Sequence, residues 1–141
     1  MVEVDPAQNS VIEVEKLTIE YDGQVALTLH QMSILKNEIF GIIGPAGSGR
    51  TSFLKAVNRM DLFDKKMEVK GVIRFRGVDI KDWKNVYSLR RRIAVVFPLP
   101  VGLPLSIYDN VAMAPRLAGI KKKAQLDEIV ESCLSRAALW D

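Results

Sequence analysis

The stretch GPAGSGRT at positions 44–51 decides how the fold of this chain is predicted. Two glycines stand five residues apart and are followed by a cation and then a hydroxyl residue, which is the spacing of a phosphate-binding loop, or P-loop. Glycine lets the backbone turn so that successive N–H groups point at phosphate oxygens. The residues of the pattern are Gly44, Pro45, Ala46, Gly47, Ser48, Gly49, Arg50 and Thr51.

The flanks of the loop agree with this interpretation. Residues 39–43 form a short apolar run that is typical of a buried strand. A helix is predicted over Thr51–Met60, and its N-terminus adds the positive end of its dipole to the loop. The alternative is a glycine-rich turn beside a basic residue. Average glycine usage makes such a match expected in about 1% of chains of this length.

One position departs from the usual pattern. Arg50 stands where lysine is usual, and its planar guanidinium has a different reach from the compact lysine ammonium. Arg50 still attracts phosphate, but we expect a changed fit around the β- and γ-phosphates. Thr51 is the candidate ligand of Mg²⁺.

Strands and helices are expected on both sides of the loop. Alternating patterns over Ile12–Tyr21 and Val25–Ile34 predict two strands joined by a turn at Asp22–Gly23, and a one-residue slip in each pattern predicts a bulge or a strand break. Residues 72–75 predict a short strand and residues 93–97 a second buried one. These elements together indicate an α/β domain.

The C-terminal third predicts a loop followed by two helices. Three prolines exclude regular structure over residues 98–104. Ser106 is the expected N-cap of a short helix, with Asp109 in the capping-box position, and Pro115 should end or kink that helix. An amphipathic helix is predicted from one apolar stripe: Leu126, Ile129, Val130, Cys133, Leu134, Ala137 and Ala138.

Composition limits the function classes. The chain has 141 residues, 48% hydrophobic and 26% charged, as in one soluble domain. No apolar run approaches the ~20 residues of a membrane span, and residues 1–10 lack the apolar core of a signal peptide, so we expect a cytoplasmic protein. Cys133 and His30 are the only residues of their kinds, which excludes an intrachain disulfide and a multi-cysteine metal site. His30 is predicted to be an ordinary surface residue.

Two short basic runs are the remaining candidates for a contact surface. Residues 90–92 are three arginines and residues 121–123 are three lysines. No aromatic residue is interleaved within either run. Such short runs are typical of solvated faces rather than nucleic-acid or lipid contacts. We therefore expect no nucleic-acid partner, and the net charge of +3 requires none.

At several places in order, the chain resembles the ATP-binding subunit of bacterial phosphate ABC importers, over about residues 12–141. The matching motifs are Tyr21-Asp22-Gly23, the P-loop, Asn58-Arg59-Met60, Leu89-Arg90-Arg91-Arg92, Ser106-Ile107-Tyr108-Asp109-Asn110-Val111 and Ala114-Pro115-Arg116-Leu117. The resemblance implies a partial P-loop NTPase core of the ABC ATPase type. It implies a tail at 1–10, an N-terminal antiparallel β subdomain and P-loop core at 11–97, and a loop and the start of a helical subdomain at 98–141.

The resemblance also implies roles for single residues. Tyr21 matches the aromatic residue that stacks on adenine, although a strand residue facing the core is the alternative. Residues 44–52, which include Ser52, match the loop that binds ATP and Mg²⁺. Pro98 stands where the family has a glutamine that touches the metal and the attacking water, and proline has neither a side-chain donor nor an N–H to replace it.

The resemblance finally implies partners and a location. Family members work with membrane-embedded permease subunits and a second ATP-binding subunit, on the inner face of the cell membrane. The family's signature loop, Walker B aspartate, catalytic glutamate and switch histidine do not occur in these residues, so no catalytic residue is assigned. Two functions stay open: the nucleotide-binding part of an ATPase subunit that powers inorganic phosphate import, or a truncated or degenerate remnant, ending at Asp141, without ATPase activity.

Overall fold

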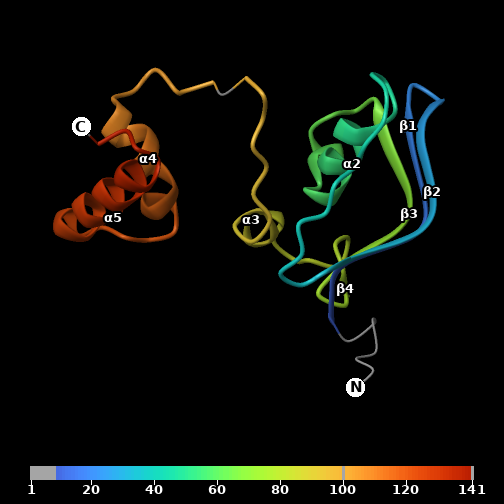
Figure 1. Cartoon of the computed structure of the whole chain (residues 1–141), viewed down its shortest axis with the longest axis horizontal. Helices are drawn as coiled ribbons and strands as arrows, with labels where there is room; N and C mark the ends of the chain where they lie inside the picture. The colour runs from blue at the N-terminus through green and yellow to red at the C-terminus, as the bar shows by residue number, and fades with distance from the viewer. Residues whose placement is uncertain (1–8, 100, 141) are drawn as a thin grey trace. The chain divides into compact units, whose positions relative to one another are not determined.

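The computed structural model describes residues 9–99 and 101–140 and divides into two units, Met1–Val95 and Val96–Asp141 (Figure 1). Each unit is described by itself. Most of the tail expected at residues 1–10, together with Pro100 and Asp141, lies outside the described residues. No helix in the described part of the chain is long and apolar enough to cross a membrane.

The first unit is built on an antiparallel sheet with the strand order β2-β1-β3-β4. Its strands are β1 (Ser10–Tyr21), β2 (Gln24–Leu35), β3 (Met67–Phe75) and β4 (Val78–Asp79). The predicted turn between the first two strands is confirmed. Asp22 and Gly23 both have positive φ, 49° and 79°, as a two-residue hairpin loop requires.

A bulge in β1 explains the slip in its apolar pattern. The pairing of β1 with β3 shifts register between Glu15 and Thr18, and Lys16 has a φ of 47°. Gly71 lies opposite, where an added Cβ would be 2.2 Å from the Lys16 carbonyl oxygen. The bulge therefore depends on a glycine at this point of β3.

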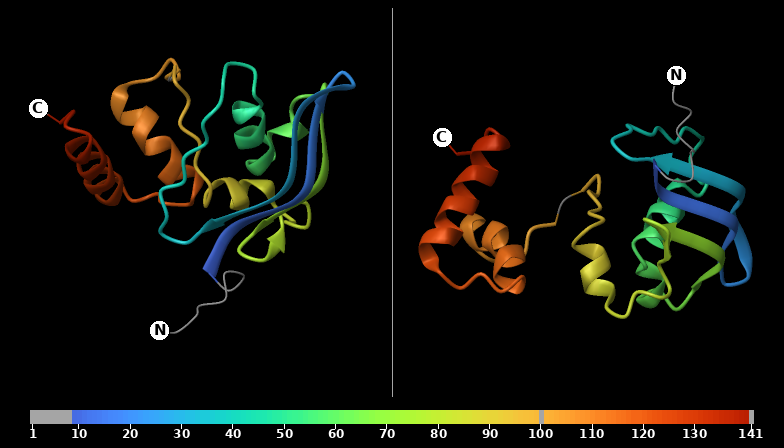
Figure 2. Two further views of the ribbon diagram at one scale, coloured as in Figure 1. Left: turned by 45° about the vertical axis from the view of Figure 1, so that its right-hand side comes forward. Right: turned by 90° about the horizontal axis from the view of Figure 1, so that it is seen from below.

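The core of the first unit forms where α2 (Arg50–Val57) lies on one face of the curved sheet (Figure 2). The buried core side chains come from the sheet, from the turn after β4, from α2 and from α3 (Val86–Arg90): Val14, Leu17, Ile19, Phe53, Ala56, Val57, Met67, Ile73, Phe75, Ile80 and Leu89. The helix α2 is shorter than predicted. It stops at Val57 because Arg59 turns into the left-handed region at φ 55°, and Met60 begins the 3₁₀ helix η1 (Met60–Leu62).

Two predicted strands are wrong. Residues 39–43 and 93–97 have no regular strand structure, and Ile43 and Val96 are 98% and 91% exposed. A parallel core strand is stable only with hydrogen-bonded neighbours and cover on both faces. Among residues 9–99 and 101–140, the only strand pairs are antiparallel ones of β1 to β4, so neither segment has a neighbour to pair with.

The second unit is a pair of helices, α4 (Ile107–Leu117) and α5 (Lys123–Arg136). The Ser106 cap is confirmed, because the Asp109 N–H donates to the Ser106 hydroxyl at 3.0 Å and that hydroxyl donates to the Asp109 carboxylate at 2.7 Å. Pro115 lies inside α4, which ends two residues later. The stripe predicted on α5 is only partly confirmed: Leu126 and Val130 are buried against Ala112, whereas Cys133, Ala137 and Ala138 are exposed.

Candidate functional site

The P-loop of residues 44–49 joins the exposed run 39–43 to the N-terminus of α2. Its turn is made by two glycines in the left-handed region, Gly47 at φ 80° and Gly49 at φ 82°. The Ser48 N–H donates to the Pro45 carbonyl at 3.2 Å and closes the turn. The glycine spacing in the sequence therefore corresponds to backbone conformations that other residues rarely adopt.

Two glycines are also required by close approach. An added Cβ at Gly49 would lie 2.6 Å from the Ala26 carbonyl oxygen of β2, and one at Gly44 would lie 2.6 Å from the Ser48 hydroxyl. The loop thus packs against β2 without room for a methyl group. The Gly49 contact holds the loop against the sheet, whereas the Gly44 contact lies within the loop.

The loop ends as the N-cap of α2, and the first turn of that helix is free for an anion. Gly49 provides no side-chain cap, and the first turn carries no acidic residue. The first N–H groups of a helix lack intrahelical acceptors and lie at the positive end of the dipole. Arg50 and Thr51 are exposed, and Ser52 is half-buried. The predicted loop residues are thus consecutive donors around one helix end.

Arg50 folds back over its own loop. One of its guanidinium nitrogens, Nη2, is 3.4 Å from the Pro45 carbonyl oxygen, a long hydrogen bond. A hollow of about 390 Å³ lies beside it, lined by Phe40, Ile42, Arg50, Thr51 and Leu54. The guanidinium is accessible at this rim, but a ligand that needs it must compete with the loop carbonyl.

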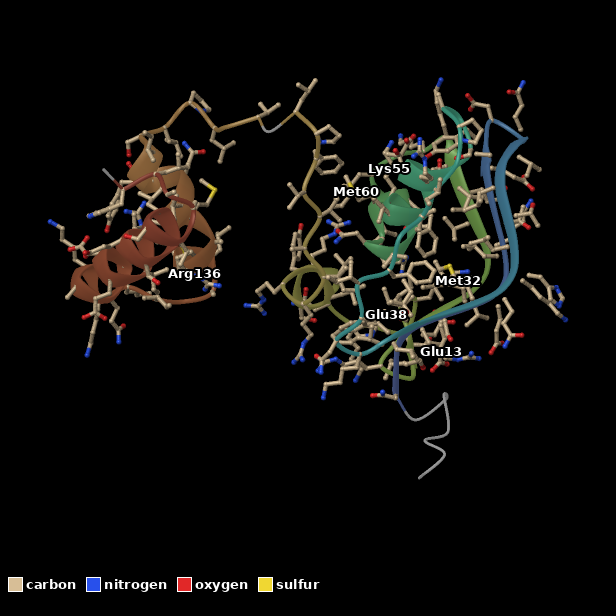
Figure 3. The ribbon with its side chains drawn as sticks, in the orientation of Figure 1. Glu13, Met32, Glu38, Lys55, Met60 and Arg136 are labelled. Atoms are coloured by element: carbon tan, nitrogen blue, oxygen red, sulfur yellow. The ribbon has the colours of Figure 1, made fainter. Side chains whose placement is uncertain are left out.

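Tyr21, at the end of β1, is half-buried and packs against the core of the first unit. Its hydroxyl donates to the sulfur of Met67 at 3.6 Å, and the Lys55 ammonium lies 5.9 Å from its ring centroid. Lys55 is on α2, one turn after Thr51 (Figure 3). Lys55 therefore connects Tyr21 to α2. The sequence did not point to Lys55, because an isolated lysine forms no pattern.

A second polar cluster lies at the other end of α2. Asn58 is 7% exposed and donates to the Ile93 carbonyl oxygen at 2.6 Å. Arg90 donates to the carbonyl oxygens of Asn58 and Arg59, at 3.0 and 2.6 Å. The run of arginines at 90–92 is therefore not simply a solvated face, since Arg90 is part-buried and Arg92 lies over the Trp83 ring, 5.9 Å from its centroid.

Shifted pKa values occur on the sheet and in the second unit. A hydrogen bond from Arg74 lowers the pKa of Glu15, and a hydrogen bond to Glu20 raises the pKa of Lys70. In the second unit, the Ser106 hydroxyl and then the Arg116 guanidinium lower the pKa of Asp109. These pairs link neighbouring strands or cap a helix, so they are structural.

Comparison with known proteins places the chain in a family. A family model described as "ABC transporter" matches residues 27–139, which contain the whole P-loop and both helices of the second unit. The chain belongs to the ABC transporter family. The resemblance expected from the sequence motifs is thereby confirmed, and so is the α/β fold class with a partial P-loop NTPase core.

Several relatives within the ABC transporter family are phosphate import ATP-binding proteins. The chain is 45% identical over 132 residues to "Phosphate import ATP-binding protein PstB" of Thermotoga maritima, covering 93% of this chain and 53% of that protein. It is 44% identical over 137 residues to PstB 2 of Bacillus subtilis, covering 96% and 51%. The PstB of Borrelia garinii is 39% identical over 143 residues, covering 96% and 53%. The chain spans about half the length of these relatives.

The residues of the P-loop fit a nucleotide with a bound cation. The donors around Gly49 are N–H groups and a guanidinium, which suit phosphate oxygens. Among residues 9–99 and 101–140, no group of three or more His, Cys, Asp or Glu side chains could hold a metal ion by itself. Mg²⁺ is commonly held by one or two protein oxygens together with substrate phosphates, and the Thr51 hydroxyl is an exposed oxygen in the first turn of α2.

Proposed function

We propose that this chain is the nucleotide-binding portion of an ATP-binding subunit that powers inorganic phosphate import. The observation that carries the proposal is the P-loop itself, with Gly47 and Gly49 in the left-handed region at the uncapped N-terminus of α2. The names of the relatives support phosphate as the transported solute. Phosphate would be bound by other subunits and not by this loop.

In this proposal, the N–H groups of residues 46–52 donate to the phosphates of ATP. Arg50 neutralises the terminal phosphates after it leaves the Pro45 carbonyl, and Thr51 holds Mg²⁺. Tyr21 stacks on adenine with its exposed part, while its hydroxyl stays on Met67. When bound, Mg²⁺ neutralises phosphate charge, and the residues of this chain bind and orient the nucleotide.

Hydrolysis by this chain alone is not part of the proposal. Pro98 is exposed in an irregular segment and has no polar side-chain atom to orient a water. The membrane-embedded permease subunits and a second ATP-binding subunit are proposed partners of the complete protein. Its proposed location is the cytoplasmic face of the cell membrane, as a peripheral subunit.

Binding of a fluorescent ATP analogue with and without Mg²⁺ tests the proposal. We expect saturable binding that strengthens with Mg²⁺ in the wild type, and Thr51→Ala should lose the Mg²⁺ dependence. Thr28→Ala removes an exposed threonine on β2 and is the matched control. If Thr51→Ala and Thr28→Ala change the Mg²⁺ dependence of binding equally, the assignment of Thr51 is contradicted.

Steady-state phosphate release tests the absence of turnover. We expect a rate far below ~1 per second, the low end of efficient phosphoryl transfer. Turnover near that value in the wild type, absent in Arg50→Ala, would show that hydrolysis does not need a polar residue at position 98.

A further inference from the structure

The C-terminal end of α2 is held by hydrogen bonds to residues 90–93, a segment more than 30 positions away in the sequence. Asn58, the C-cap of α2, donates its side-chain Nδ2 to the Ile93 carbonyl oxygen at 2.6 Å. Arg90, the last residue of α3, donates Nε to the Asn58 carbonyl at 3.0 Å and Nη2 to the Arg59 carbonyl at 2.6 Å. We call Asn58, Arg59, Arg90 and Ile93 the α2 clamp.

The Arg90 guanidinium of the α2 clamp is fixed from more than one side. The last carbonyls of a helix lack intrahelical donors and carry the negative end of its dipole, so a cation is favourable there. The Phe63 ring covers the guanidinium, with its centroid 4.5 Å from the central carbon. Arg59, in turn, donates to the Ile80 carbonyl at 3.0 Å and pairs with Asp61 at 3.2 Å. The clamp therefore has little freedom to rearrange without breaking several contacts.

The P-loop and the α2 clamp are the two ends of one short helix. α2 has eight residues, which corresponds to a length of roughly 12 Å at 1.5 Å per residue. Its Phe53, Ala56 and Val57 are buried in the core, so the helix moves as a packed unit. The chain continues from Ile93 to Phe97 and Pro98.

We infer that Asn58 and Arg90 are positioning residues that tie the segment beginning at Ile93 to the end of the P-loop helix. Through them, nucleotide in the loop changes the stability of the backbone at Arg92 and Ile93. The inference rests on the proposed function in one respect only, because it requires nucleotide to bind at the loop. The contacts of the clamp are hydrogen bonds within the chain and do not themselves depend on that proposal.

Hydrogen exchange of the full chain, followed by mass spectrometry with and without Mg²⁺-ATP, tests this inference. The reporters are the amides of Arg92 and Ile93, which both donate to the Leu89 carbonyl, at 2.8 and 3.0 Å. Loop amides over residues 44–53 report binding in the same sample. Arg90→Ala and Asn58→Asp each remove clamp donors, and Asn58→Asp does so with almost no change of shape.

The matched control is Arg91→Ala, which removes the same charge from the exposed neighbouring side chain. Without nucleotide, we expect exchange at Arg92 and Ile93 to be roughly ten- to hundredfold faster in both clamp variants and unchanged in the control. With nucleotide, the wild type and the control should gain protection at Arg92 and Ile93. The clamp variants should gain protection only at residues 44–53. Arg90→Lys should restore part of the protection at Arg92 and Ile93.

The possible results separate the two proposals. Protection at Arg92 and Ile93 that follows nucleotide equally in all variants would overturn the inference and leave nucleotide binding intact. No protection of residues 44–53 in the wild type would overturn nucleotide binding and the transmission with it. Even if nucleotide does not bind, faster exchange at Arg92 and Ile93 in the clamp variants supports the clamp. If exchange there is no faster than in the wild type, the clamp is overturned. Far-UV circular dichroism confirms that each variant is folded.

Discussion

The antiparallel sheet and the run at residues 39–43 are both rich in apolar residues, but those of the sheet include buried ones and those of the run are exposed. In the sheet, Ile19 and Ile73 are buried because each strand has a neighbour and α2 covers one face. In the run, Ile39 and Ile43 are almost completely exposed. The difference shows that apolar residues do not make a strand by themselves. A hairpin partner lies two residues away for β1, whereas a core strand needs partners that the described residues do not provide.

The largest expected effect concerns the bulge that shapes the sheet. Gly71→Ala would place a Cβ 2.2 Å from the Lys16 carbonyl oxygen at a φ of +91°. Backbone has to move on both strands, so we expect a loss of about 4 kcal/mol or more in the free energy of unfolding. Chemical denaturation measures this loss. Gly77→Ala is the control, with a similar φ of +78° and open space around it, and it should cost about 1–2 kcal/mol. Equal losses would show that the close approach has no energetic weight.

The second prediction tests the contrast between the sheet and the exposed run directly. Ile73→Ala empties a site that is 2% exposed and should cost roughly 2–5 kcal/mol. Ile43→Ala, at 98% exposure, should leave the free energy of unfolding within about 0.5 kcal/mol of wild type. Thermal and urea denaturation of both variants compare the two sites.

The exposed run should also have a signature in solution. Ile39 and Ile43 of the run are exposed large apolar side chains. Outside the run, Val96, Leu99 and Val101 are exposed as well. Such surface favours dye binding and self-association, so we expect the chain to bind ANS and to melt broadly. Ile43→Ser should reduce ANS binding. A monodisperse chain that melts sharply and binds no ANS would mean that the run is covered in solution.

The fourth prediction concerns Arg50. Replacement by lysine removes the hydrogen bond to the Pro45 carbonyl and restores the compact cation of the usual pattern. Charge-assisted hydrogen bonds are worth roughly 1.5–3 kcal/mol, so the affinity for Mg²⁺-ATP should rise by about tenfold or more. Titration with a fluorescent ATP analogue measures the change. An unchanged or weaker affinity would show that arginine fits the phosphates as well as lysine does.

The smallest expected effect lies at the N-terminus of α4. The pKa of Asp109 is lowered by the Ser106 hydroxyl first and by Arg116 second, so the ionised form stabilises the fold. This stability is fully present above the ordinary aspartate pKa of about 3.9 and is lost as pH falls through the lowered value. Asp109→Asn should therefore melt slightly below wild type at pH 7 and together with it near pH 2. Far-UV melting curves at both pH values check this, and a gap that persists in acid would assign the effect to packing.

Sequence patterns predicted the features that depend on nearby residues. The hairpin at Asp22–Gly23, the Ser106 cap and the P-loop turn each follow from a few consecutive side chains. The predicted strands at 39–43 and 93–97 failed because strand formation depends on pairing with distant residues. The clamp at Asn58 and Arg90 was missed for the same reason, since its partners are 31 to 35 residues apart.

The sequence by itself determined the turn within residues 44–51, because its glycines adopt backbone conformations that other residues rarely adopt. It also determined that a helix follows this turn and that a hairpin precedes it. Only the tertiary structure decided which apolar segments are buried, that Arg50 folds onto Pro45, that Lys55 lies over Tyr21 and that Arg90 caps α2. Local patterns fix dihedral angles, whereas burial and long-range hydrogen bonds depend on which surfaces meet when the whole chain packs.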